Sequence, residues 1–297
     1  MKLLTYMNRT DDNPQVGILH RTKNAVIPLS LLDIEYKDML TTIEQLTNAE
    51  FERLNLAQNA PDIPSIPLSA VKLCAPIQKP LQDIICLGVN YREHRAEYAK
   101  YKENAFQPED TYAIYFSKRV NETSATGDII PSYPGLVDSL DYEAELAVII
   151  GKDAKNVSEE DAEKYIFGYT ILNDVSARNI QTRHQQWYFG KSFDGFTPLG
   201  PYITTADELP LPLNISIKSY VNEELRQDSN TNLMLFSIPH IISELSKGMT
   251  LKTGTIISTG TPAGVGMGME PPNFLQPGDE VRCEIEGIGT LINTIGY

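Results

Sequence analysis

One stretch, residues 141–151, constrains this chain more than any other. It reads Asp-Tyr-Glu-Ala-Glu-Leu-Ala-Val-Ile-Ile-Gly, so three acids at alternate positions run into an apolar segment. Side chains alternate between the two faces of an extended strand, and Asp141, Glu143 and Glu145 would therefore share one face. Neighbouring carboxylates repel each other unless a cation or a proton lies between them. A divalent cation bound by the carboxylate oxygens would remove this repulsion. The alternative is a solvated edge strand with an acidic outer face.

The bulk composition narrows the partners that such a chain can have. Its 297 residues suit one large domain or two, and 41% of them are hydrophobic, which is enough for a substantial core. The net charge of -14 argues against nucleic acid and anionic membranes, because both favour basic surfaces. The sequence shows no signal peptide or transmembrane run, and its three cysteines form no zinc or disulfide pattern. We therefore expect a soluble cytoplasmic protein.

Residues 1–72 read as a small α+β domain, followed by a larger domain over 73–297. Segments 2–7 and 15–19 have the pattern of short strands, and 29–56 carries leucines and isoleucines at helical spacing. Three prolines at every third position in 59–67 indicate an extended linker between the two domains. Every side chain to which we give a chemical role comes after this linker.

The first such group is a histidine and a glutamate on a predicted helix. The apolar run 83–88 predicts a strand, and Asn90 is placed to cap the helix that follows. On that helix His94 and Glu97 stand three residues apart and share a face. A carboxylate that orients an imidazole makes a general base, although an ordinary surface ion pair has the same spacing. The polar segment 98–111 reads either as a cover over a site or as a plain surface loop.

A carboxylate, a guanidinium and an amide follow the buried strand that we predict over 165–173. Asp174, Arg178 and Gln181 stand at i, i+4 and i+7, so on a helix they would share one face. An acid at the end of a strand can reach a metal held by the neighbouring strand, and the guanidinium fork fits a substrate carboxylate. An amphipathic helix with its polar side in water has the same spacing.

Two loops rich in glycine supply the last candidates. Lys191 lies in the Gly- and Pro-rich stretch 190–201, where its ammonium group is either held over a site or solvated. Thr261 lies in the loop 259–266, whose backbone N–H groups and hydroxyl can bind an anion. That loop lacks the Lys-Ser/Thr ending of a P-loop, which argues against a nucleotide phosphate site of that kind.

Taken together, these segments resemble the fumarylacetoacetate hydrolase family in their order and spacing over residues 83–297. The motifs are Gly88-Val89-Asn90-Tyr91-Arg92-Glu93-His94 with Glu97, the acidic strand 141–152, Asn173-Asp174-Val175-Ser176-Ala177-Arg178 with Gln181, Gly190-Lys191-Ser192-Phe193-Asp194, Pro198-Leu199-Gly200-Pro201, and the loop 259–266. Residues 1–72 resemble the small extra domain of some bacterial members. The chain departs from the family pattern at Asn179, where an acid is common, and at Arg119, where a proline often stands.

The resemblance implies a fold, a cofactor and a set of roles. The fold would be α+β, with a mixed β-roll or β-sandwich catalytic domain, short helices and a small N-terminal α+β domain, in a homodimer. The cofactor would be Mg2+ or Mn2+, which three carboxylates with waters or substrate oxygens suit. The implied metal ligands are Glu143, Glu145 and Asp174; the implied catalytic residues are His94, Glu97 and Lys191; the implied substrate contacts are Arg178, Gln181 and Thr261.

The implied reaction is cleavage of a C–C bond in a 2-oxo acid by a metal-dependent hydrolase, with an acylpyruvate or a fumarylacetoacetate-like substrate. The bond breaks to an enolate, and the His94–Glu97 pair activates the attacking water. The same site would serve an oxaloacetate decarboxylase, which uses no water, or an isomerase of 2-hydroxyhepta-2,4-diene-1,7-dioate. A member that only binds metabolites is a further alternative, against which the intact motifs argue.

Overall fold

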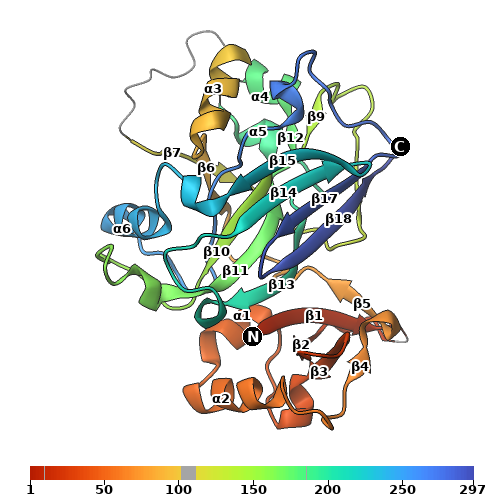
Figure 1. Ribbon diagram of the computed structural model, residues 1–297, viewed down its shortest axis with the longest axis vertical. Coiled ribbons are helices and arrows are strands. Elements are labelled where there is room, and N and C mark those ends of the chain that lie inside the picture. The colour runs from red at the N-terminus through yellow and green to blue at the C-terminus, as the bar shows by residue number, and fades with distance from the viewer. Residues whose placement is uncertain (10, 102–111, 185) are drawn as a thin grey trace.

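Most strands of the protein belong to two sheets in the computed structural model, which describes residues 1–9, 11–101, 112–184 and 186–297 (Figure 1). Within these residues the larger sheet has eleven strands, in the order β4 (Ile66–Pro67), β3 (Ala25–Pro28), β2 (Gln15–Leu19), β1 (Lys2–Asn8), β13 (Leu199–Thr205), β11 (Ile166–Asn173), β10 (Ala144–Ile150), β16 (Ile256–Ser258), β6 (Ile84–Gly88) and β7 (Ile114–Lys118), with β5 (Val71–Cys74) beside β1. The smaller sheet has five, in the order β15 (Glu224–Asn230), β14 (Ser216–Val221), β17 (Glu280–Ile285), β18 (Gly289–Ile295) and β8 (Ile129–Ile130).

The remaining elements are short. Strands β9 (Leu140–Asp141) and β12 (Ser176–Ala177) pair with each other. The α-helices are α1 (Met39–Gln45), α2 (Asn48–Ala57), α3 (Arg92–Tyr101), α4 (Arg178–Arg183), α5 (Tyr188–Lys191) and α6 (Ile238–Gly248). Sheets that combine parallel and antiparallel pairs, with short helices around them, confirm the predicted α+β class. No helix among the described residues is long and apolar enough to cross a membrane.

Strand β10 lies at the centre of the molecule and is buried on both faces. Leu146 and Val148 pack into one apolar cluster with residues of the smaller sheet such as Ile217. Ala147 and Ile149 point the other way, into a second cluster that includes residues of β1 and β6. A strand covered on both faces needs apolar residues at successive positions, which explains the run that follows the acids.

The N-terminal part agrees with the sequence in its strands and differs in its helices. The strands predicted over 2–7 and 15–19 are present as β1 and β2. The helical pattern over 29–56 is divided between several elements, because the chain forms a 3-10 turn at Leu29–Leu32 and then α1 and α2. Each α-helix begins at its own cap, since Asp38 accepts a hydrogen bond from the Thr41 backbone and Thr47 forms a capping box with Glu50.

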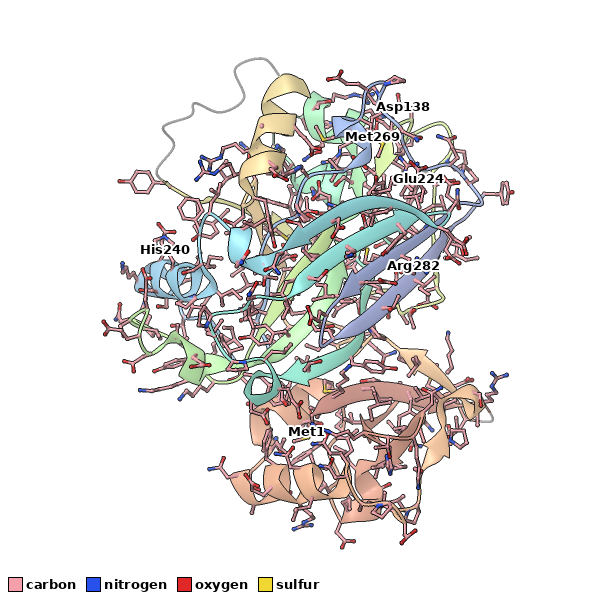
Figure 2. All side chains as sticks on the ribbon, viewed as in Figure 1. Met1, Asp138, Glu224, His240, Met269 and Arg282 are labelled. Carbon is pink, nitrogen blue, oxygen red and sulfur yellow. The ribbon has the colours of Figure 1, made fainter. Side chains whose placement is uncertain are left out.

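The larger sheet continues across the predicted domain boundary at residues 72 and 73. Strand β1 pairs with β13, with Lys2 opposite Thr204, and also with β5, which itself spans the boundary. The terminal ammonium of Met1 donates to Thr205 Oγ1 at 2.6 Å, and Figure 2 shows Met1 between the N-terminal strands and β13. The division into domains over 1–72 and 73–297 stays a prediction, and strands from both sides of this boundary pair within one sheet.

Three local elements complete the fold. The hairpin between β14 and β15 turns at Asn222 and Glu223, both at positive φ. Helix α6 is capped by Ser237 and ends at Gly248. After Ser158 the chain forms only a 3-10 turn at Ala162–Tyr165. Most of the segment read as a cover, residues 102–111, lies outside the described residues.

Candidate active site

Three buried carboxylates meet where β10 and β11 pair. One ligand oxygen from each of Glu143, Glu145 and Asp174 lies within 4.8 Å of the others. The antiparallel register places Ala144 opposite Asn173, so the acids on either side of this pair are neighbours. Hydrogen bonds fix the junction, since the Asp174 N–H donates to the Glu143 carbonyl at 2.9 Å and the Glu143 N–H to Asn173 Oδ1 at 3.0 Å. We call these three acids the carboxylate cluster.

The carboxylate cluster fits a hard divalent cation by its donors and by its charge. Burial, together with the charges of Asp174 and Glu143, raises the pKa of Glu145 well above its ordinary range. The cluster therefore favours a proton or a cation at Glu145. Three carboxylate oxygens are the kind of ligand that Mg2+ and Mn2+ take, so the residues present fit the cofactor that the sequence implies.

Two buried lysines contact the cluster, and only one was singled out from the sequence. Lys191, at the end of α5, donates from Nζ to Glu143 and to Asp174 at 2.6 Å each. Burial lowers its pKa, but the charges of Asp174 and Glu143 outweigh that effect, so the pKa is raised and the ammonium stays charged. Lys118, at the end of β7, donates to the other Asp174 oxygen at 2.7 Å and was missed. In the sequence Lys118 stands two residues after the apolar run 113–116, and nothing local marks it as buried.

The predicted single face of Asp174, Arg178 and Gln181 is wrong in its cause, because helix α4 begins only at Arg178. The side chains nevertheless come close together. Arg178 is 1% exposed, and its Nη2 pairs with Glu143 at 2.6 Å while its Nη1 donates to Gln181 Oε1 at 3.1 Å. The arginine therefore binds an acid of the cluster and an amide of its own helix.

Thr261 is held equally firmly by the protein. Its hydroxyl donates to the Ala144 carbonyl at 2.9 Å and accepts from Gln227 Nε2 at 2.7 Å. Both hydrogen bonds are buried, so they tie the loop 259–266 to β10 beside the carboxylate cluster. The assignment of Thr261, Arg178 and Gln181 to substrate stays a prediction.

Helix α3 brings a histidine and a glutamate to the same place. His94 Nδ1 and Glu97 Oε2 are 3.3 Å apart, and the other oxygen of Glu97 accepts from the Gly264 N–H at 2.9 Å. Because a carboxylate only accepts, His94 donates from Nδ1 and its Nε2 is left to exchange a proton. We call this pair the dyad. Its role as the acid and base of a reaction stays a prediction.

Asn90 does not cap α3, contrary to expectation. Its amide donates to the carbonyls of Phe236 and Thr259, and its Oδ1 accepts from the Phe236 N–H at 2.8 Å. The side chain thus joins three segments at the base of α3. Nothing in the local sequence distinguishes this role from that of a cap, because both use Oδ1 as an acceptor of a backbone N–H.

One small cavity lies between the dyad and the carboxylate cluster. Its volume is about 10 Å³, room for about one water molecule. The polar lining consists of His94, Glu143, Glu145, Arg178, Gln181, Lys191 and Thr261. The apolar lining includes Trp187, the only tryptophan of the chain, which meets Phe116 edge to face at 5.1 Å. The Trp187 ring also lies directly on Gly88, where a Cβ atom would be 2.2 Å from a ring carbon.

The loop 259–267 binds anions, as its sequence indicates, but these anions are carboxylates of the chain itself. The Gly260 N–H donates to Glu145 at 2.9 Å, and Gly264 donates to Glu97. The N–H groups of Gly266 and Met267 both donate to Asp141, at 2.7 and 3.0 Å. One loop therefore fixes an acid of the carboxylate cluster, an acid of the dyad and a third acid outside both.

Comparisons with known proteins find relatives of this chain. A family model described as Fumarylacetoacetate (FAA) hydrolase C-terminal matches residues 83–296. Oxaloacetate tautomerase YisK of Bacillus subtilis is 47% identical over 229 residues, which are 77% of this chain and 74% of that protein.

Several solved structures match over the full chain, and two of them bear on the site. Fumarylacetoacetate hydrolase from Exiguobacterium antarcticum is 35% identical, with a TM-score of 0.85 over 100% of this chain and 99% of that one. Maleylpyruvate hydrolase from Sphingobium, solved with manganese(II) and pyruvate, is 31% identical, with a TM-score of 0.76 over 100% of this chain and 99% of that one.

Proposed function

The chain belongs to the fumarylacetoacetate hydrolase family, and from this premise we propose that it moves a proton between the keto and enol forms of a short 2-oxo acid, with oxaloacetate as the first candidate. The observation that carries the proposal is that His94 lines the same small cavity as Glu143 and Glu145. A proton-exchanging group thus stands beside a site suited to a cation. The relative named oxaloacetate tautomerase, at 47% identity, supports oxaloacetate as that acid.

The dyad would carry the proton. Tautomerisation removes a proton from the carbon next to the keto group and adds one to the keto oxygen, and no C–C bond breaks. His94 Nε2 would accept the proton from carbon and deliver it to the keto oxygen, while Glu97 holds the ring through Nδ1. The Gly264 N–H, which binds the second oxygen of Glu97, keeps that carboxylate in place during the exchange.

The cationic side chains would hold the acid and its developing charge. A divalent cation on Glu143, Glu145 and Asp174 would supply the Lewis acidity that favours negative charge on the keto oxygen. Lys191, charged and buried at the edge of the cavity, adds a fixed positive charge to the same region. Gln181 accepts from Arg178 through Oε1, which leaves its amide group to donate to a substrate carboxylate.

Hydrolysis of a C–C bond is the second candidate, and one feature of the cavity favours it. The space beside His94 has room for about one water molecule, and a hydrolase needs one water there. The same His94–Glu97 pair would then activate that water. The relatives named fumarylacetoacetate hydrolase and maleylpyruvate hydrolase support this alternative.

A panel of assays separates these reactions. Purified protein is incubated with oxaloacetate and with acetylpyruvate, each with Mg2+, with Mn2+ and with a chelator. We expect the enol absorbance of oxaloacetate to decay faster than its spontaneous rate, only with metal and without release of pyruvate. Release of pyruvate from oxaloacetate would instead make the protein a decarboxylase. Metal-dependent cleavage of acetylpyruvate would make it a hydrolase. Activity that is unchanged by the chelator would contradict the metal site. The expected homodimer stays a separate prediction, which light scattering tests.

A further inference from the structure

Asp141 stands at the first position of the acidic alternation, yet it lies outside the carboxylate cluster. The strand is interrupted at residues 142 and 143, so Asp141 belongs to β9, opposite Ser176 of β12, while Glu145 belongs to β10. The alternation that predicts three acids on one face therefore fails at Asp141. Its side chain is 0% exposed, and a buried carboxylate needs partners of its own.

Four N–H groups donate to the Asp141 carboxylate. Oδ2 accepts from Arg178 Nε at 2.9 Å and from the Met267 N–H at 3.0 Å. Oδ1 accepts from the Gly266 N–H at 2.7 Å and from the Tyr142 N–H at 3.0 Å. Only an ionised carboxylate accepts at both atoms, because an amide presents a donor at one of them. The surroundings of Asp141 thus specify an acid and not merely a polar side chain.

One of these donors links Asp141 to the carboxylate cluster. Arg178 lies between two acids, with Nε on Asp141 and Nη2 on Glu143 at 2.6 Å. Asp141 therefore neutralises part of the charge that Arg178 would otherwise direct at Glu143 alone. A cation that binds to the cluster competes with Arg178 for the same carboxylate, so the charge of Asp141 favours the cation.

The other donors link Asp141 to the dyad. Gly266 and Met267 belong to the loop in which Gly264 donates to Glu97. Close packing fixes this contact, because a Cβ atom at Gly266 would lie 2.7 Å from Asp141 Oδ1 and 2.4 Å from the Asn273 carbonyl. A shift of Asp141 would therefore move the loop segment that holds Glu97.

We propose that Asp141 is a positioning residue that couples the carboxylate cluster to the dyad, through Arg178 on one side and the loop 264–267 on the other. It tunes the affinity of the cluster for its cation by sharing the charge of Arg178. The inference rests on the proposed metal site and not on which 2-oxo acid is the substrate.

The test is a double-mutant cycle in which calorimetry measures the Mn2+ affinity of each variant. Asp141→Asn keeps the shape and removes one negative charge, so we expect Mn2+ to bind about tenfold more weakly or worse. Arg178→Gln removes the opposing positive charge. In the double variant Asp141→Asn with Arg178→Gln the net charge of the pair is as in the wild type, and we expect most of the lost affinity to return.

Controls separate this role from a loss of stability. Asn293 lies on β18, outside the cavity lining, and its buried amide donates to the carbonyls of Ala125 and Asp128, so Asn293→Ala should lower thermal stability and leave Mn2+ affinity unchanged. Gly266→Ala should disturb Asp141 from the loop side and lower kcat more than Asn293→Ala does.

Three outcomes would overturn the inference. Wild-type Mn2+ affinity in Asp141→Asn, with a loss of stability alone, would make Asp141 structural. A double variant as weak as Asp141→Asn alone would refute the sharing of charge with Arg178. A wild-type protein that binds no Mn2+ would overturn the metal site, and with it both the proposed function and this inference. In the first two outcomes the proposed function stands.

Discussion

The N-terminal strands and the region around the carboxylate cluster bury polar groups in different ways. Among the residues of 1–72 that the structure describes, the buried polar side chains are Thr5, His20, Thr42 and Gln58. Around the cluster the buried side chains include Lys118, Asp141, Glu143, Glu145, Asp174, Arg178 and Lys191. Buried charges cost several kcal/mol each in desolvation, which pairing only partly offsets. The N-terminal part thus buries neutral polar side chains, whose desolvation costs less free energy of folding than that of charged ones. The region around the cluster buries charged side chains, and a cation bound between the carboxylates would reduce the repulsion among them.

The largest effect should come from removing charge at the centre. The double substitution Glu143→Gln with Glu145→Gln removes two of the three negative charges of the carboxylate cluster, so we expect no measurable metal binding and no turnover. Glu44→Gln with Glu52→Gln makes the same chemical change on exposed positions of α1 and α2 and should change neither. Calorimetry with Mn2+ and the oxaloacetate assay measure both pairs. Turnover that survives in the first pair would refute the site.

The dyad should separate chemistry from metal binding. His94→Ala removes the proton-exchanging ring, so we expect kcat to fall by about 100-fold to 10,000-fold while Mn2+ affinity is kept. His240→Ala is the matched control, since His240 lies on α6, near the surface in Figure 2, and pairs there with Glu159 at 3.1 Å. An equal loss of metal binding and turnover in His94→Ala would make that histidine structural.

Metal binding should release a proton. Because the pKa of Glu145 is raised well above its ordinary value of 4.5, the metal-free site holds a proton there over the pH window between the two values. Mn2+ displaces it, so affinity should rise with pH across this window and then level off. The folded state binds this proton more tightly than the unfolded chain does, so the metal-free protein should lose stability as pH rises through the same window. Calorimetry in buffers of different ionisation enthalpy counts the released protons, and a count of zero would contradict the protonated site.

The smallest effect should come from the N-terminal part. Thr47→Ala removes the cap of α2 and its reciprocal bond with Glu50, which should lower the free energy of unfolding by about 1 kcal/mol. Turnover and Mn2+ affinity should stay at wild-type values, because α2 contributes nothing to the site. Urea unfolding measures the loss. A fall in activity larger than the fall in folded protein would show that the N-terminal part acts on the site.

The sequence predicts the carboxylate cluster better than it predicts what holds the cluster together. Glu143 and Glu145 could be placed because strand periodicity and the family motif agree. Asp141 could not be placed, because its hydrogen-bond partners are Arg178, 37 residues away, and the backbone N–H groups of Gly266 and Met267. Lys118 has no local signal for burial, because only the pairing of β6 with β7 carries it into the site.

The helices also show that contacts between distant segments cannot be predicted from local spacing. The apolar spacing over 29–56 indicates helical residues but does not show where each helix begins. The caps at Asp38 and Thr47 start separate helices within this segment. The helical spacing of Asp174 and Arg178 brought the right residues together for the wrong reason. Side chains converge there through strand pairing, which no periodicity in a single segment encodes.

The contact between Trp187 and Gly88 gives the protein a built-in optical reporter. With a single tryptophan in the chain, all indole fluorescence comes from one ring on the wall of the cavity between the dyad and the carboxylate cluster. The emission of that ring depends on nearby charges and on water, both of which change when a cation or an organic acid enters. Occupancy of the site can therefore be followed in the native, unlabelled protein, on the timescale of stopped flow.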